Sequence, residues 1–322
     1  MWKYISKRLA QGLIVLLIVS SLGFIIFQFL GDPVTAMAGQ YATQAELAEV
    51  RHALGLDQPI YIQYFNFINN AVHGNFGMSY MARLPAAEIV FQRLPASIEL
   101  ALAAEVIAIF FGVTFGVLVA AFPRSAFSKF IAFGALFGVS LPSFAVGISL
   151  ILVFAVIFPI LPPLGRGELV ELPWGWQTGF LTLDGLKHLI LPAFTLGMLQ
   201  LSLLFRLTRS GMQEALRSDY IRTARAKGLG HISVLFKHAL RNVLIPVVTI
   251  IGLQFGQLIG FSIVTESIFQ WPGTGNLLLA AIFDSDFPII ASYIILIATL
   301  VVLLNTIVDI TYAFLNPRIR YD

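Results

Sequence analysis

The residues that could perform chemistry are few in this chain, and no catalytic motif connects them. The chain has no cysteine, which excludes disulfides, zinc–thiolate sites, iron–sulfur clusters and a cysteine nucleophile. Neither a phosphate-binding G-x-x-x-x-G-K-[ST] loop nor a G-x-S-x-G nucleophile turn occurs in the sequence. The histidines are scattered without metal-site spacing, so we interpret each as a surface or interfacial side chain: His52, His73, His188, His231 and His238. We therefore expect no catalytic, cofactor-binding or metal-binding residue.

Three acidic residues, Glu99, Glu105 and Asp309, fall within strongly apolar segments. An ionisable group inside a membrane is a functional candidate by default. We expect Glu99 to reach the membrane interface and Asp309 to pair with an arginine on the inner side. Glu99 and Glu105, six positions apart, do not share a helix face, Asp309 lies in another segment, and no Lys or Arg lies deep in any apolar segment, so a proton relay is disfavoured.

Gln254 and Gln257 are uncharged amides deep in another apolar segment. On a helix they lie on a face well away from the seam of Gly252, Gly256 and Gly260. Buried amides need partners, either on a neighbouring helix or in water. Bridging a neighbouring helix and lining a solute pathway therefore remain equally open for these two residues.

The elements that hold these residues are transmembrane helices. Apolar residues make up 58% of the 322-residue chain and charged residues 11%, against about 25% charged in ordinary soluble proteins. A helix needs about 20 mostly apolar residues to cross a bilayer. Pro142 and Pro192 should kink the third and fourth spans, and Gly112 with Gly116 and Gly134 with Gly138 should be packing seams. We expect an all-α integral membrane protein with six transmembrane helices, at residues 9–30, 97–122, 130–158, 189–207, 243–264 and 289–315.

The distribution of basic residues predicts the orientation of these helices. Fifteen of the twenty Lys and Arg residues fall at the two termini, in the 122–129 turn, and in the 208–242 loop with its margin. Because positive charge favours the cytoplasmic side, we expect both termini and the 208–242 loop in the cytoplasm. The first span is preceded by basic residues like a signal peptide, but its apolar run is too long, so we expect a retained helix.

Residues 31–96 should form a small helical cap on the outer surface. Thr43 and Glu46 have the spacing of a capping box that starts one helix, which Gly55 ends. Pro59 should open a second helix that ends near Gly74. We divide the chain into residues 1–96, the first span plus this cap, and residues 97–322, a five-helix core. The cap is either simply a folded surface or a docking surface for something arriving from outside.

The 208–242 loop is the most ordered segment predicted outside the membrane. Ser218 can cap a helix that continues to Lys227, and Gly228 closes it. A second helix should follow through residues 234–242. Two short helices hinged at glycine suggest a rigid lever presented to a cytosolic partner.

Three segments of this loop and the residues after it occur in a characteristic order: Arg222-Thr223-Ala224-Arg225-Ala226-Lys227-Gly228, then Lys237-His238-Ala239-Leu240-Arg241-Asn242, then Ile245-Pro246. Together they resemble the coupling loop of ATP-binding-cassette importer permeases. The match is to the dipeptide, oligopeptide and nickel group. The general importer signature begins Glu-Ala-Ala, and Arg222 stands at the glutamate position here, so a glutamate contact does not transfer to it. Further motifs of the group occur in order along the chain: Gly31-Asp32-Pro33, Leu54-Gly55-Leu56-Asp57-Gln58-Pro59, Gly74-Asn75-Phe76-Gly77-Met78-Ser79, Trp271-Pro272-Gly273-Thr274-Gly275, Asp286-Phe287-Pro288 and Asn316-Pro317-Arg318.

The resemblance implies a permease subunit in a bacterial inner membrane that forms half of a pathway for peptides or similar small solutes. Its implied partners are a second, related permease chain, two cytosolic ATP-binding subunits that carry ATP and Mg, an extracytoplasmic substrate-binding protein and membrane lipid, with no nucleic acid. The implied binding-protein docking residues are Trp271, Pro272 and Gly273, and Gln254 and Gln257 are pathway candidates. The implied ATPase-coupling residues are Tyr220, Arg222, Thr223, Ala224, Arg225, Ala226, Lys227 and Gly228.

Two other classes of function are alternatives to the importer permease. An ion-coupled secondary transporter acting alone would need a titratable or ion-binding site in the bundle, which the separated acids do not provide. An intramembrane enzyme would need a nucleophile–base pair, and a scaffold would not need the lever-like loop. Which solute is carried does not follow from the sequence.

Overall fold

The computed structural model describes residues 2–29, 34, 43–53 and 55–315 of the chain. Five of the described helices are long and apolar enough to cross a membrane: Ser6–Ile25, Ala86–Ala121, Leu183–Arg217, His231–Ile268 and Phe287–Ile310. The prediction of a helical membrane protein is therefore confirmed. The chain folds as two compact units, one of residues 1–95 with 273–322 and one of residues 96–272. Whether the division predicted at residue 96 marks a separate domain stays a prediction.

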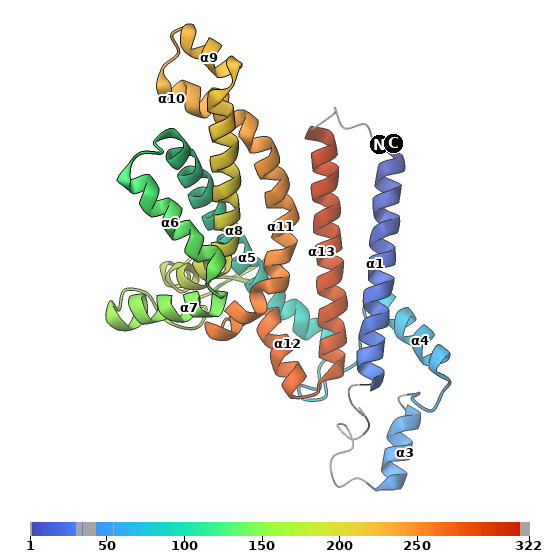
Figure 1. Cartoon of the computed structure of the whole chain (residues 1–322). Coiled ribbons are helices and arrows are strands. Elements are labelled where there is room, and N and C mark those ends of the chain that lie inside the picture. The colour runs from blue at the N-terminus through green and yellow to red at the C-terminus, as the bar shows by residue number, and fades with distance from the viewer. Residues whose placement is uncertain (1, 30–33, 35–42, 54, 316–322) are drawn as a thin grey trace. The chain divides into compact units, whose positions relative to one another are not determined.

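The first unit packs the first described helix of the chain against the last one. Helices α1 (Trp2–Phe29) and α13 (Phe287–Leu315) run side by side along their length (Figure 1). The helix α12 (Thr274–Phe283) packs against α13, and α4 (Ile60–Val72) packs against α1. Tyr64 of α4 makes the contact with α1. Its hydroxyl lies 2.8 Å from Ser21 Oγ, and its ring packs edge-on against Phe24 with 5.3 Å between the ring centroids.

The local signals in residues 43–77 predicted the short helices of this unit. In α3 (Gln44–Ala53), Thr43 N donates to Glu46 Oε2 at 2.7 Å, and Glu46 N donates back to Thr43 Oγ1 at 3.4 Å. This reciprocal pair is the predicted capping box. Gly55 and Gly74 have φ of +68° and +74°, the left-handed conformation in which glycine ends a helix.

The second unit is built around α8 (Leu183–Arg217). This helix packs against α6 (Ala126–Ser140), α7 (Ser143–Ile151) and α11 (Arg241–Ile268). The part of α5 (Ala86–Ala121) from Ala96 onward also belongs to this unit. At one end of α8 and α11 lie α9 (Asp219–Ala226) and α10 (His231–Ser233), as Figure 1 shows.

The third predicted span, residues 130–158, is not one helix. It is broken into α6 and α7, and α7 continues as the π-helical segment η1 (Leu152–Ile157). Pro142 lacks a backbone N–H and disfavours a helical conformation at Leu141, so the chain restarts a helix with Pro142 as its N-cap. The prediction of a kink here was therefore too mild, whereas Pro192 lies inside α8 without ending it.

The helix predicted at residues 234–242 is also longer than expected. A π-helical segment η3 (Val234–Leu240) runs from α10 directly into α11, so residues 231–268 form one continuous helical stretch. Only the first helix of the predicted lever, α9, stands apart. The prediction of two short helices hinged at glycine is therefore wrong for the second one.

A small β-hairpin in the second unit was not expected from the sequence. Strands β1 (Val170–Leu172) and β2 (Trp176–Thr178) pair antiparallel across the 3-10 turn η2 (Pro173–Gly175). Gly175 has φ +75°, which the tight turn requires. The fold is therefore helical with one added hairpin.

The glycine seam of α5 brings it into close contact with α8. A Cβ added at Gly112 would lie 2.9 Å from Leu204 Cβ, and one at Gly116 would lie 2.6 Å from Thr208 Cβ. A Cβ at Gly134 or Gly260 would meet no atom within 4 Å. The packing role predicted for these glycines is confirmed for Gly112 and Gly116, and for Gly138, where an added Cβ would lie too close to Ser202 Oγ, but it does not extend to Gly134 within this chain.

Candidate functional site

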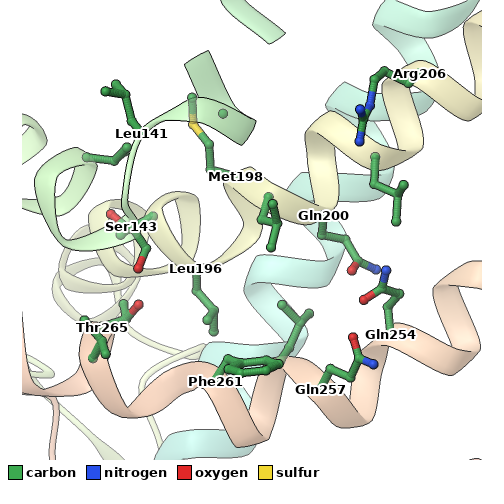
Figure 2. Close-up of a pocket in the computed structure, with 17 residues that line it drawn as sticks. Leu141, Ser143, Leu196, Met198, Gln200, Arg206, Gln254, Gln257, Phe261 and Thr265 are labelled. Carbon is green, nitrogen blue, oxygen red and sulfur yellow. The ribbon is translucent and has the colours of Figure 1, made fainter. Parts of the chain in front are cut away.

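The two predicted pathway residues line one cavity of about 480 Å³ in the second unit. Gln254 and Gln257 come from α11, and Gln200 and Arg206 face them from α8 (Figure 2). The side chains of Gln200 and Gln254 point toward one another. Residues at the junction of α6 and α7 complete the wall. Hydroxyl groups and apolar side chains make up much of the remaining lining, including Ser143, Thr195, Thr265, Leu196, Leu258 and Phe261.

A buried carboxylate lies behind this cavity. Gln200 Nε2 donates to both oxygens of Glu105, at 2.9 and 3.0 Å. Both side chains are buried, with Gln200 3% and Glu105 5% exposed. The intramembrane Glu105 of α5 is therefore satisfied by the amide of a cavity residue on α8, and does not form part of a chain of acids.

Glu99 is 2% exposed and paired within the protein, and its place at the membrane interface stays a prediction. Arg166 Nη2 lies 2.5 Å from Glu99 Oε2 and also donates to the Gln177 carbonyl oxygen at 2.6 Å. A carboxylate in a membrane protein is costly unless it is paired. The partner, Arg166, lies in the loop between η1 and α8 and folds back onto α5, which the sequence pattern did not indicate.

Trp271 contacts both α5 and Arg166. Its indole nitrogen donates to the Ala96 carbonyl oxygen at 2.9 Å, and the Arg166 guanidinium lies 5.9 Å from its ring centroid. Trp271 is 1% exposed and Pro272 is half-buried. The indole therefore holds this turn in place, and a docked protein would have to contact neighbouring exposed atoms such as Gln270.

Glu266 is a fourth acid in the helical core, and it was missed from the sequence. It is fully buried in α11 and accepts hydrogen bonds from Ser97 Oγ at 2.7 Å and Ser262 Oγ at 2.8 Å. The segment Thr265-Glu266-Ser267 reads as the polar end of a span. Of its two serine partners, only Ser262, four residues before Glu266 on the same helix, could have been predicted from the sequence.

Two of the resemblance motifs meet inside the first unit. Ser79 Oγ donates to Asp286 Oδ2 at 2.5 Å, and the Met81 backbone N–H donates to the same oxygen at 3.4 Å. Burial and the nearby Asp286 carboxylate raise the pKa of Tyr80. The Gly74–Ser79 and Asp286–Pro288 motifs are therefore joined through hydrogen bonds to one buried carboxylate.

The helix α9 holds most of the predicted coupling residues and has two distinct faces. Ile221 and Ala224 are buried against Met212 and Ala215 of α8 and Val234 of η3. Ser218 stands at the N-cap position as predicted, although its hydroxyl donates back to Ala215 O and does not cap α9. Gly228, with φ +77°, follows the helix end. The rest of the helix and its end leave six of these coupling residues exposed, half of them basic: Tyr220, Arg222, Thr223, Arg225, Ala226 and Lys227.

Asp309 pairs with an arginine as predicted. Arg8 Nη1 lies 3.2 Å from Asp309 Oδ2, joining α1 to α13. Within the described residues, no three His, Asp or Glu side chains gather in an arrangement that could hold a metal ion.

Two family models together match nearly the whole chain. Residues 112–321 match the binding-protein-dependent transport system inner membrane component, and residues 1–101 match the N-terminal part of the same kind of membrane component. The chain belongs to this family. It is therefore a permease subunit of a binding-protein-dependent ATP-binding-cassette importer, and a non-catalytic, multi-pass protein of the inner membrane.

The permease is similar to curated relatives over its full length. It is 41% identical over 336 aligned residues to the di/tripeptide transport system permease protein DppB of Pseudomonas aeruginosa (strain UCBPP-PA14), with all of both chains covered. It is 40% identical over 322 residues to the glutathione transport system permease protein GsiC of Escherichia coli (strain K12), again with all of both chains covered. The GsiC of Shigella flexneri serotype 5b (strain 8401) gives the same values.

Proposed function

We propose that this permease forms half of the translocation pathway for a dipeptide, a tripeptide or glutathione. The di/tripeptide and glutathione permeases to which it is similar support this solute class. The other half would come from a second permease chain of the same family. The cavity between α8, α11 and the α6–α7 junction is the part of the pathway that this chain contributes, with Gln254 and Gln257 as lining residues.

The proposed topology has six crossings with both termini in the cytoplasm. Five crossings are the long helices, and the α6–α7 pair provides the third in chain order. The basic residues of the 122–129 turn and the 208–242 loop support the orientation. In this arrangement the loop with α9 faces the cytosol, and residues 43–85 with the β-hairpin face outward.

The helix α9 is the proposed coupling helix. Its inner face is fixed by Ile221 and Ala224, so a push on α9 is transmitted to α8 and η3 and from there into the membrane helices. Its exposed face supplies Tyr220, Arg222 and Arg225 for a groove in a cytosolic ATPase that binds ATP and Mg. The two-faced packing of α9 is the observation that carries this proposal, because a mere connecting loop would not need a buried side.

The proposed docking point of an extracytoplasmic binding protein is the turn at Trp271, Pro272 and Gly273, with the contact itself made by exposed neighbours such as Gln270, since Trp271 and Gly273 are buried. Trp271 and Arg166 brace this turn against α5. A braced turn can transmit a docking contact into α11, which ends at Ile268. Differential affinity of the binding protein for two states of the permease would then couple delivery to opening.

Affinity purification in mild detergent tests the proposed assembly. The permease should copurify with two ATPase chains and a second permease, and should show ATPase activity only with them. Ala226→Trp, on the exposed face of α9, should remove the ATPase from the complex. Ala48→Trp, at an exposed alanine of α3 on the outer cap, is the matched control and should leave the complex intact. Solute uptake by this chain alone, driven by a proton or sodium gradient, would contradict the proposal.

A further inference from the structure

The carboxylate of Glu105 fixes the orientation of an amide at the cavity wall. In the structure the NH₂ group of Gln200 faces Glu105 and donates to both of its oxygens. The Gln200 carbonyl oxygen is then the end left for the cavity. Within the described part of the chain, no donor is recorded on that oxygen. Gln200 therefore presents an acceptor whose direction is set from behind.

The cavity also contains a cation that is not neutralised. Arg206 is the one charged side chain among the described residues that line it. It is exposed, and it forms no ion pair with any residue described here. Figure 2 shows it on α8 on the same side of the cavity as Gln200, with Gln254 and Gln257 across from them.

These groups match the chemistry of a short peptide. A guanidinium binds a carboxylate through paired hydrogen bonds, and an oriented carbonyl oxygen accepts from an ammonium or amide N–H. Gln254 and Gln257 can each donate and accept. Apolar side chains such as Leu196 and Phe261 can accommodate substituents. A volume of about 480 Å³ is within the range of small-molecule sites.

Resting on the proposed function, we infer that Gln200 and Arg206 form a solute-binding subsite inside the permease, which receives the carboxylate and an N–H group of a peptide in transit. Glu105 is a positioning residue, since it acts only through Gln200. The subsite would hold the solute after its release from the binding protein, so that fewer cycles of ATP hydrolysis occur without solute transport.

The test uses the whole importer, reconstituted in proteoliposomes with its binding protein and ATP. Radiolabelled L-alanyl-L-alanine and reduced glutathione serve as probes, and the readout is solute transported per ATP hydrolysed. Arg206→Gln and Gln200→Leu should lower this ratio about tenfold, roughly the effect of losing one charge-assisted or buried hydrogen bond. Glu105→Gln should lower it less, because the Gln200 amide can then adopt either orientation. Arg124→Gln, an exposed inner-turn arginine outside the cavity, should not change it.

A second measurement separates binding from folding. Glycyl-photoleucine, a photoreactive dipeptide, is irradiated in the vanadate-trapped importer, and adducts should map to residues 195–206 and 254–265. Arg206→Gln lies on an exposed side chain, so its complex should assemble even if Gln200→Leu does not. An unchanged transport ratio in Arg206→Gln, or adducts confined to other segments, would overturn the subsite while the importer still works. Failure of the wild-type importer to transport either probe would instead overturn the proposed function and the subsite with it.

Discussion

Arg166 and Glu99 form a buried ion pair with 2.5 Å between Nη2 and Oε2, although 67 positions separate them in the chain. The pair fastens the loop before the β-hairpin to the beginning of the membrane part of α5. Gly165 N adds a hydrogen bond to Phe269 O at 2.8 Å, so the loop also reaches the end of α11.

Removing one partner of this pair should destabilise the permease strongly. Glu99→Gln or Arg166→Met alone leaves a buried group uncompensated, at a cost of about 3–5 kcal/mol. The double variant should be closer to wild type than either single variant, because no isolated charge remains. Thermal unfolding in detergent, followed by tryptophan fluorescence, ranks the stabilities of the two single variants and the double variant. A double variant as unstable as the sum of the singles would refute the pairing.

Gly116 should be far less tolerant of a methyl group than Gly134. A Cβ at Gly116 would meet Thr208 at 2.6 Å, so Gly116→Ala should force α5 from α8 and cost about 1–3 kcal/mol. Gly134→Ala is the matched control, since its Cβ would meet no atom within 4 Å and alanine favours a helix by up to about 1 kcal/mol. Melting temperatures of the two variants give the comparison, and equal values would contradict the close contact.

The two alanines of α9 should respond differently to enlargement. Ala224 is 6% exposed and packs in the cluster with Met212 and Val234, so Ala224→Leu should overpack it and lower stability by about 1–3 kcal/mol. Ala226 is exposed, and Ala226→Leu should leave the melting temperature of the isolated permease unchanged. Protease sensitivity of the 208–242 loop provides an independent measurement. An equal loss of stability in Ala224→Leu and Ala226→Leu would contradict the buried inner face of α9.

His52 should titrate above its ordinary pKa because its ring Nδ1 lies 2.6 Å from Asp57 Oδ2. The hydrogen bond and the charge of Asp57 raise the pKa of His52, and the bond to His52 lowers that of Asp57. The histidine contribution to stability is then full below about pH 6.5 and is lost as pH rises through the raised value. The aspartate contribution is full above about pH 4 and is lost as pH falls through the lowered value.

Asp57→Asn should return the pKa of His52 to near 6.5. Carbon-13 labelling of the histidine rings gives five signals in this chain, and the His52 signal is identified by its loss in His52→Gln. The signal of His73, which hydrogen-bonds a backbone carbonyl, serves as the internal control. A His52 midpoint unaffected by Asp57→Asn would show that the pair does not form in solution.

Features set by nearby residues could be predicted from the sequence. The capping box of Thr43 and Glu46, the helix ends at Gly55 and Gly74, and the start of α9 after Ser218 each depend on contacts within a few residues. The long helices followed from apolar length alone. Asp309 was expected to find an inner-side arginine, and Arg8 occupies that place.

Features set by distant partners could not be predicted in the same way. Arg166 belongs to a loop that could equally have faced water, and only the folded chain brings it to Glu99. Gln200 gave no signal of its own, because its importance comes from Glu105 on another helix and from Gln254 across the cavity. The break at Pro142 was underestimated, since proline inside an apolar run is compatible with both a kink and a full stop. Pro192, which stays inside α8, shows the other outcome.

The break between α6 and α7 implies that the backbone groups on either side of it are hydrated. The last carbonyl groups of α6 and the first N–H groups of α7 have no partners within their own helices, and hydrocarbon cannot supply any. Gly138, Leu141 and Ser143, which flank the break, all line the cavity. Hydration of these backbone groups would allow the chain to interrupt a helix at membrane depth, and a passing solute would exchange water for the same backbone hydrogen bonds.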